Sequence, residues 1–182
     1  MSAFRLPSLS LFALAACWLS CMASPAFAQN ATEQVQTQVG VVTPLSFIQT
    51  EELNFGKIFA SNTAGTVTVA PNGTRTRTGG VTLFGSDHQP AEFAGMGSFN
   101  QRVQVSLGSN TIFLTGPGVR MRARTFTIGS TPTAVLSTNP QVFRIAAATG
   151  AFRFPVGATL EVNANQAPGT YSGIWTITLN YQ

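Results

Sequence analysis

The residues able to do acid–base or nucleophilic chemistry are few in this sequence. Only 9% of the 182 residues are charged, and the single histidine is His88. Ser86, Asp87 and His88 are the residue types of a nucleophilic triad, but three neighbours in one turn cannot take the geometry that relays a proton from serine to histidine. We therefore expect a surface loop here and a protein that is not an enzyme. An extracellular hydrolase with His88 as its base is the least favoured interpretation.

The sequence offers no convincing ligand set for a metal or a cofactor. Glu51 and Glu52 could contribute to a calcium site, yet no Asp-rich loop accompanies them. The glycines at 95 and 97 lack the strand–helix context of a phosphate-binding loop. Both cysteines, Cys17 and Cys21, lie near the N-terminus, so the remaining chain has no thiolates for a zinc or iron–sulfur site. We expect neither metal nor cofactor.

One charge pattern predicts a contact surface. Arg120, Arg122 and Arg124 alternate with apolar residues, which places the three arginines in a row on the exposed face of a strand. Such a row could contact an anionic ligand, either acidic sugars or lipid phosphates, through bidentate hydrogen bonds. Alternatively, it protects an edge strand from pairing or keeps the surface soluble. The overall charge is too small and too scattered for a nucleic-acid binder.

The elements that must position these residues are predicted to be strands. Turn signals such as Pro71-Asn72-Gly73, Gly116-Pro117-Gly118 and Pro168-Gly169 recur along the chain, and no segment after the first 28 residues has helical periodicity. The regular spacing of short strands predicts an all-β fold, an immunoglobulin-like antiparallel β-sandwich of the pilin or adhesin type. Strands are expected at 66–70, 74–78, 112–115, 119–128, 141–147, 151–163 and 170–181.

The first 28 residues have the pattern of a secretory signal peptide. Arg5 supplies a positive start, residues 6–18 an apolar core, and residues 24–28 a small-residue cleavage site. The apolar run is too short to span a membrane, and no later stretch approaches that length. A lipoprotein attached through Cys17 is the minority alternative. We expect an exported protein of the periplasm, the outer-membrane surface or an extracellular appendage.

Residues 29–42 are predicted to be an N-terminal extension that forms a strand. Val35, Thr37, Val39 and Val41 share one face, and Pro44 separates them from the domain, expected at 43–182. An apolar strand left in water has unpaired backbone groups and exposed valines, so it must pair with another strand. It could complete the sheet of a neighbouring copy or fold back on its own domain, and the pattern fits both.

The C-terminal strand shows the clearest alternation in the chain. Trp175, Ile177, Leu179 and Tyr181 lie on one face, opposite Thr176, Thr178 and Asn180. We expect this face to contribute to an interface.

The chain resembles a bacterial family of secreted, pilin-like β-sandwich domains of unknown function. The segments that carry the resemblance are Thr43–Phe47, Leu53–Gly56, Gly65–Val69, Phe154–Leu160 and Gly169–Gly173. The ending Trp175–Gln182 is also similar to the last strand of chaperone–usher pilus subunits, which alternates apolar residues and has a penultimate tyrosine. Many of those subunits have a disulfide, for which the chain after residue 28 has no cysteine.

The resemblance implies an incomplete sandwich. In such subunits a periplasmic chaperone fills the place of the missing strand, and the N-terminal extension of the next subunit then replaces the chaperone. Val35, Val39 and Val41 would be the anchors of the donor strand, and the Trp175–Tyr181 face would accept it. The expected function is that of an exported structural subunit of a surface appendage or coat, which assembles by β-strand exchange with other copies or related subunits and could use a periplasmic chaperone. A surface- or carbohydrate-binding adhesin domain is the alternative.

Overall fold

A computed structural model of the chain describes residues 39–129 and 133–182. The residues 40–182 form one compact unit. All regular secondary structure in the described residues is strand, paired antiparallel, which confirms the predicted all-β sandwich. Among these residues, no helix is long and apolar enough to cross a membrane.

Eleven strands make up the described part of the chain. They are β1 (Ser46–Glu51), β2 (Lys57–Val69), β3 (Arg75–Phe84), β4 (Ala91–Met96), β5 (Arg102–Leu107), β6 (Thr111–Leu114), β7 (Met121–Ile128), β8 (Ala134–Val135), β9 (Gln141–Arg144), β10 (Ala151–Val162) and β11 (Ile177–Tyr181).

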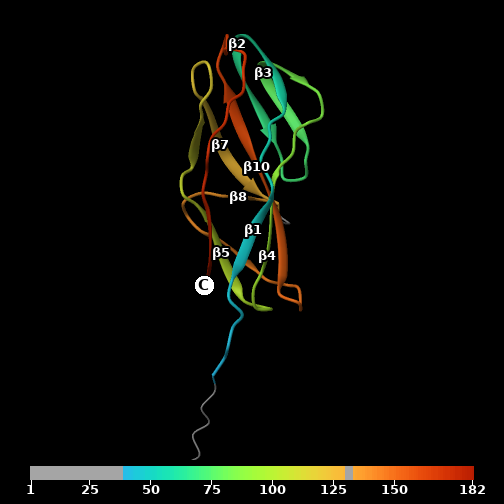
Figure 1. Cartoon of the computed structure of the whole chain (residues 1–182), viewed down its shortest axis with the longest axis vertical. Helices are drawn as coiled ribbons and strands as arrows, with labels where there is room; N and C mark the ends of the chain where they lie inside the picture. The colour runs from blue at the N-terminus through green and yellow to red at the C-terminus, as the bar shows by residue number, and fades with distance from the viewer. Residues whose placement is uncertain (1–38, 130–132) are drawn as a thin grey trace, which may run out of the picture. The chain divides into compact units, whose positions relative to one another are not determined.

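The strands form two sheets (Figure 1). The larger sheet has the order β1-β4-β10-β2-β3, and β7 pairs with β10 and with the short strands β6 and β8. The smaller sheet has the order β11-β5-β9. β10 is central because its twelve residues pair with β4, β2 and β7, and because alternate positions from Phe154 to Val162 are buried.

The chain passes from one sheet to the other between β5 and β6, and the C-terminal segment runs beside both of these strands. β5 lies in the smaller sheet and β6 in the larger one. β11 pairs with β5, whereas Ser172 forms an isolated bridge with Thr115, directly after β6. The C-terminal segment therefore lies alongside both sheets.

Aromatic residues fill the core between the sheets. Trp175 packs against Phe93 and Phe126, with ring centroids 5.7 and 5.2 Å apart. Phe143 of β9 contacts Phe152 and Phe154 of β10, which places β9 over β10. Burial of rings of this size is the main source of stability in such a fold.

Tyr171 fixes the turn that leads into the C-terminal segment. Its hydroxyl donates to the carbonyl of Ala167 at 2.9 Å and accepts from the backbone amide of Gly118 at 3.0 Å and from the side-chain amide of Gln166 at 2.7 Å. A tyrosine that bonds back to the backbone a few residues upstream is a hallmark of immunoglobulin-like sandwiches.

The structure agrees with some predicted strands and corrects others. The hairpin at 70–74 is present, with a hydrogen bond of 2.9 Å from the Ala70 amide to the Thr74 carbonyl. The C-terminal strand begins at Ile177 instead of residue 170, because residues 173–176 pass between two sheets where a continuous ladder is lost. Residues 39–42, expected at the end of a strand, are in no strand of this chain.

Candidate functional site: the free edge of the C-terminal strand

β11 is an edge strand of the smaller sheet. It pairs with β5 from Ile177–Leu107 to Tyr181–Val103, and in the described residues no strand pairs with its other edge. The backbone groups on that edge are therefore available to a further strand.

The hydrogen-bond register shows which backbone groups point to the free edge. The carbonyl of Thr176 accepts from Gly108 at 2.9 Å, and the amide of Gln182 donates to Arg102 at 3.0 Å. Since residues in an antiparallel ladder alternate between facing the partner and facing away, the even-numbered residues bond to β5. The N–H and C=O groups of the odd-numbered residues 175–181 consequently point away from β5.

The same odd-numbered residues carry the inward side chains. Leu179 is only 8% exposed, and Trp175, Ile177 and Tyr181 are partly buried against the core, while Thr176, Thr178 and Asn180 are exposed. The shared face predicted for these four residues is therefore present. A strand added at this edge would place its inward residues directly beside them.

Tyr181 connects this edge to the start of the domain. Its hydroxyl donates to the carbonyl of Thr43 at 2.6 Å and accepts from the amide of Ser98 at 2.7 Å. The Thr43 amide in turn donates to the Ser98 hydroxyl. The point at which the N-terminal extension leaves the domain is thus held at the end of β11, where the mark of the C-terminus lies close to β1 in Figure 1.

The described end of the N-terminal extension is exposed. Val39 is 83% and Val41 92% exposed, and neither belongs to a strand. Val35 and Thr37, the other two predicted donor residues, lie outside the described residues. Residues 40–42 therefore pair with no strand in the described part of the chain.

A groove opens beside Trp175 where β6 and the C-terminal segment separate. Its volume is about 340 Å³, and Ile112, Phe113, Ile174 and Trp175 supply its apolar lining. Ile174 is 95% exposed at its rim. The groove lies between the Thr115–Ser172 bridge and the Gly108–Thr176 hydrogen bond. Between these two contacts the C-terminal segment pairs with neither β6 nor β5.

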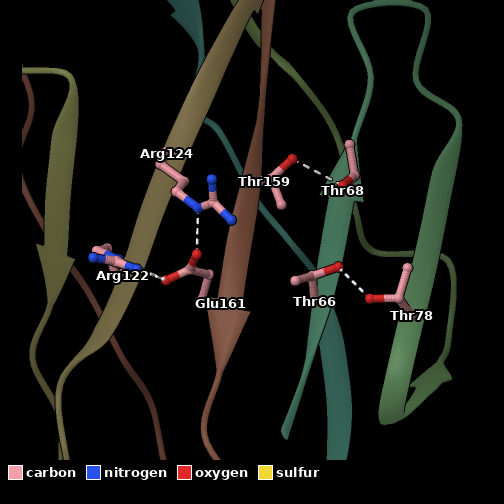
Figure 2. A network of polar contacts seen from close by, with 7 residues as sticks. All are labelled: Thr66, Thr68, Thr78, Arg122, Arg124, Thr159 and Glu161. Atoms are coloured by element: carbon pink, nitrogen blue, oxygen red, sulfur yellow. Dashed lines mark hydrogen bonds and ion pairs between the residues drawn. The ribbon is translucent and has the colours of Figure 1, made fainter.

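The three arginines of the predicted row lie on the outer face of the larger sheet, and two of them share one carboxylate. Glu161 accepts from Nε of Arg122 at 2.6 Å and from Nε of Arg124, as Figure 2 shows. The guanidinium of Arg120 lies 4.6 Å from the ring centre of Phe113.

Glu161 is kept ionised by this arrangement. Burial acts to raise the pKa of its carboxyl, but the hydrogen bonds and charges of Arg122 and Arg124 together outweigh burial and hold the pKa below its usual value. The arginine row is therefore partly neutralised, which sequence alone did not indicate.

The other candidate residues from the sequence do not come together. Asp87 pairs with Lys57 at 3.3 Å, and Glu51 accepts from the Gln89 side chain at 3.0 Å. Across residues 39–129 and 133–182, no three potential metal ligands form a group.

Sequence reasoning missed the residues that connect distant segments. Glu161, Ser98 and Thr43 gain their roles only through strand register, and no local pattern marks them.

The family of this chain is shown by its match to a family model. The family described as domain of unknown function (DUF4402) matches residues 45–181. The chain belongs to this family. No curated protein and no solved structure matches it. The match covers both sheets and ends at Tyr181, so the C-terminal edge strand is part of the family domain.

Proposed function

We propose that this DUF4402 protein is an exported structural subunit of a surface appendage or coat, assembled by strand exchange between copies. The observation that carries the proposal is the free edge of β11, where the backbone groups of the odd-numbered residues from 175 to 181 are available beside their four inward side chains. Strand addition at an exposed sheet edge combines main-chain hydrogen bonds with side-chain pockets.

The inward-facing residues predicted for the N-terminal extension have the same spacing as those of β11. Val35, Thr37, Val39 and Val41 are two residues apart, as are Trp175, Ile177, Leu179 and Tyr181. Residues directly opposite each other in a ladder have side chains on the same face, so the four positions of one set can oppose the four of the other. The exposure of Val39 and Val41 in the single chain supports their use by a partner.

The direction of the extension favours a second copy over self-pairing. Because Tyr181 holds Thr43 at the end of β11, residues 35–41 of the same chain could reach this edge only by running parallel to β11. The extension of another copy can run antiparallel, and antiparallel pairing is slightly more stable for each residue. A periodic assembly follows when each copy donates one extension and accepts another.

A chaperone would use the same edge before assembly. The unpaired backbone of β11 is an aggregation hazard while subunits are stored, and a periplasmic chaperone that adds its own strand would remove it. The similarity of Trp175–Gln182 to the last strand of chaperone–usher pilus subunits supports this role for a chaperone.

The proposal is tested by adding charge to the donor face. We expect Val39→Asp/Val41→Asp to abolish the ladder of oligomers that the wild-type protein shows on gel electrophoresis without boiling, because two carboxylates would be buried against the partner's core. The matched control is Gln38→Asp/Gly40→Asp, which adds the same charge on the opposite face, and an added Cβ at Gly40 meets no atom within 4 Å. A monomer band alone for the wild-type protein, or equal loss in both variants, contradicts the proposal.

A further inference from the structure

A second surface of the domain lies on the outer face of the larger sheet, and its rim residue Phe113 also lines the groove beside Trp175. Two cross-strand rows cover β6, β7, β10, β2 and β3. One consists of Thr111, Arg124, Thr159, Thr68 and Thr76, and the other of Phe113, Arg122, Glu161, Thr66 and Thr78. Their neighbours along the strands, such as Val67, Ala123 and Leu160, are buried, so both rows face outward.

The rows form a continuous surface that carries six threonine hydroxyl groups. Five strands at a spacing of about 4.8 Å give a width of about 19 Å. The hydroxyls of Thr66 and Thr78 are 2.7 Å apart and those of Thr68 and Thr159 2.9 Å apart, as Figure 2 shows. A hydroxyl has one donor and two acceptor sites, so these pairs hold their oxygens in place and leave capacity to bond outward.

The surface has a net positive charge, and the guanidinium groups of Arg122 and Arg124 are held in place by Glu161. Arg120, Arg122 and Arg124 stand against Glu161, which gives a net charge of about +2 when all four groups are ionised. A guanidinium has five N–H donors, and two oxygens of one carboxylate cannot accept them all. Glu161 therefore orients the guanidinium groups of Arg122 and Arg124, and their remaining N–H donors are free to bond outward.

We propose that this face binds an acidic polysaccharide. Carboxylates along such a chain fit the guanidinium forks, and its sugar hydroxyls fit the threonine rows. An anionic membrane is the less suitable partner, because membrane-surface binding needs apolar side chains that enter the lipid next to the cations. Phe113, at the rim, is the one apolar side chain in the two rows; it is 48% exposed, and the Arg120 guanidinium lies 4.6 Å from its ring centre.

The test measures binding of the mature chain to polygalacturonate, with neutral dextran and phosphatidylglycerol vesicles as parallel probes. We expect binding to polygalacturonate and about a tenfold weaker affinity for Arg122→Gln/Arg124→Gln, since charged hydrogen bonds are lost. The matched control is Arg102→Gln/Arg144→Gln, which removes the same charge from the smaller sheet and should change the affinity less than about twofold. The oligomeric state of each variant is recorded by light scattering, so strand exchange is assessed separately.

A second variant distinguishes the planar geometry of the guanidinium group from its charge, and it is a more conservative change that is less prone to misfold. Arg122→Lys/Arg124→Lys keeps both charges but loses the planar fork, and we expect it to bind polygalacturonate several-fold more weakly than wild type. The proposal is overturned if the wild-type chain does not bind polygalacturonate or binds vesicles alone. It is also overturned if the two glutamine variants lose affinity equally, or if the lysine variant binds as tightly as wild type.

Discussion

At the scale of single residues, two tyrosine hydroxyls connect segments that are far apart in the sequence. Tyr181 joins the last strand to the start of the domain, and Tyr171 joins the turn at Ala167 to Gly118. The alternation of apolar residues predicts which way these rings point, but not what their hydroxyls bond to. Those partners depend on register across the whole sandwich, which no local pattern contains.

Tyr171→Phe is expected to lower the free energy of unfolding by about 1–3 kcal/mol, because the Gly118 amide and the Ala167 carbonyl lose a partner in a partly buried turn. Urea denaturation measures the change. Thr178→Val removes an exposed hydroxyl from β11 and should change stability by no more than about 0.5 kcal/mol. A Tyr171→Phe protein as stable as wild type would show that the hydroxyl does not secure the turn.

At the scale of elements, period-two alternation predicts strands wherever one face is buried. β7 and β10 follow their expected ranges closely, and the Pro71-Asn72-Gly73 turn joins β2 to β3. The prediction is poorest where the chain changes sheets. Residues 173–176 keep the alternation of a strand, but the segment there leaves β6 for β5, and alternation does not record which sheet a residue faces.

The contact between β7 and β10 should depend on pH through Glu161. Since its folded pKa is below the usual value, which is about 4.3 in the unfolded chain, the ion pairs stabilise the fold at neutral pH and this contribution is lost as the pH falls through the folded pKa. Glu161→Gln should therefore cost about 1 kcal/mol at pH 7, a modest value because both arginines are half exposed, and less at pH 3.

Thermal unfolding of wild type and Glu161→Gln at the two pH values measures this difference. Glu52→Gln is the control, because Glu52 forms no ion pair with any described residue. An equal cost for Glu161→Gln at pH 7 and pH 3 would mean that the carboxylate charge is not what couples the strands.

At the scale of the whole molecule, strand exchange and self-pairing differ in direction, and this difference can be measured. Antiparallel exchange with full overlap places Val39 opposite Ile177 of another copy, whereas parallel self-pairing places Val39 opposite Leu179 of the same chain. Hydrogen-bonded neighbours in an antiparallel ladder have Cα atoms about 5.5 Å apart, within the range of a disulfide. No cysteine follows Cys21, so any disulfide formed after that residue is one between the introduced cysteines.

Val39→Cys/Ile177→Cys is therefore expected to give a covalent ladder on non-reducing gels after mild oxidation. Val39→Cys/Leu179→Cys should give little product, and so should Val39→Cys/Thr178→Cys, because Thr178 faces away from the core. A closed, fast-migrating monomer from Val39→Cys/Leu179→Cys, with no ladder from the first pair, would mean that each extension completes its own domain. In that case the edge of β11 would be sealed in every copy, and assembly would need a different surface.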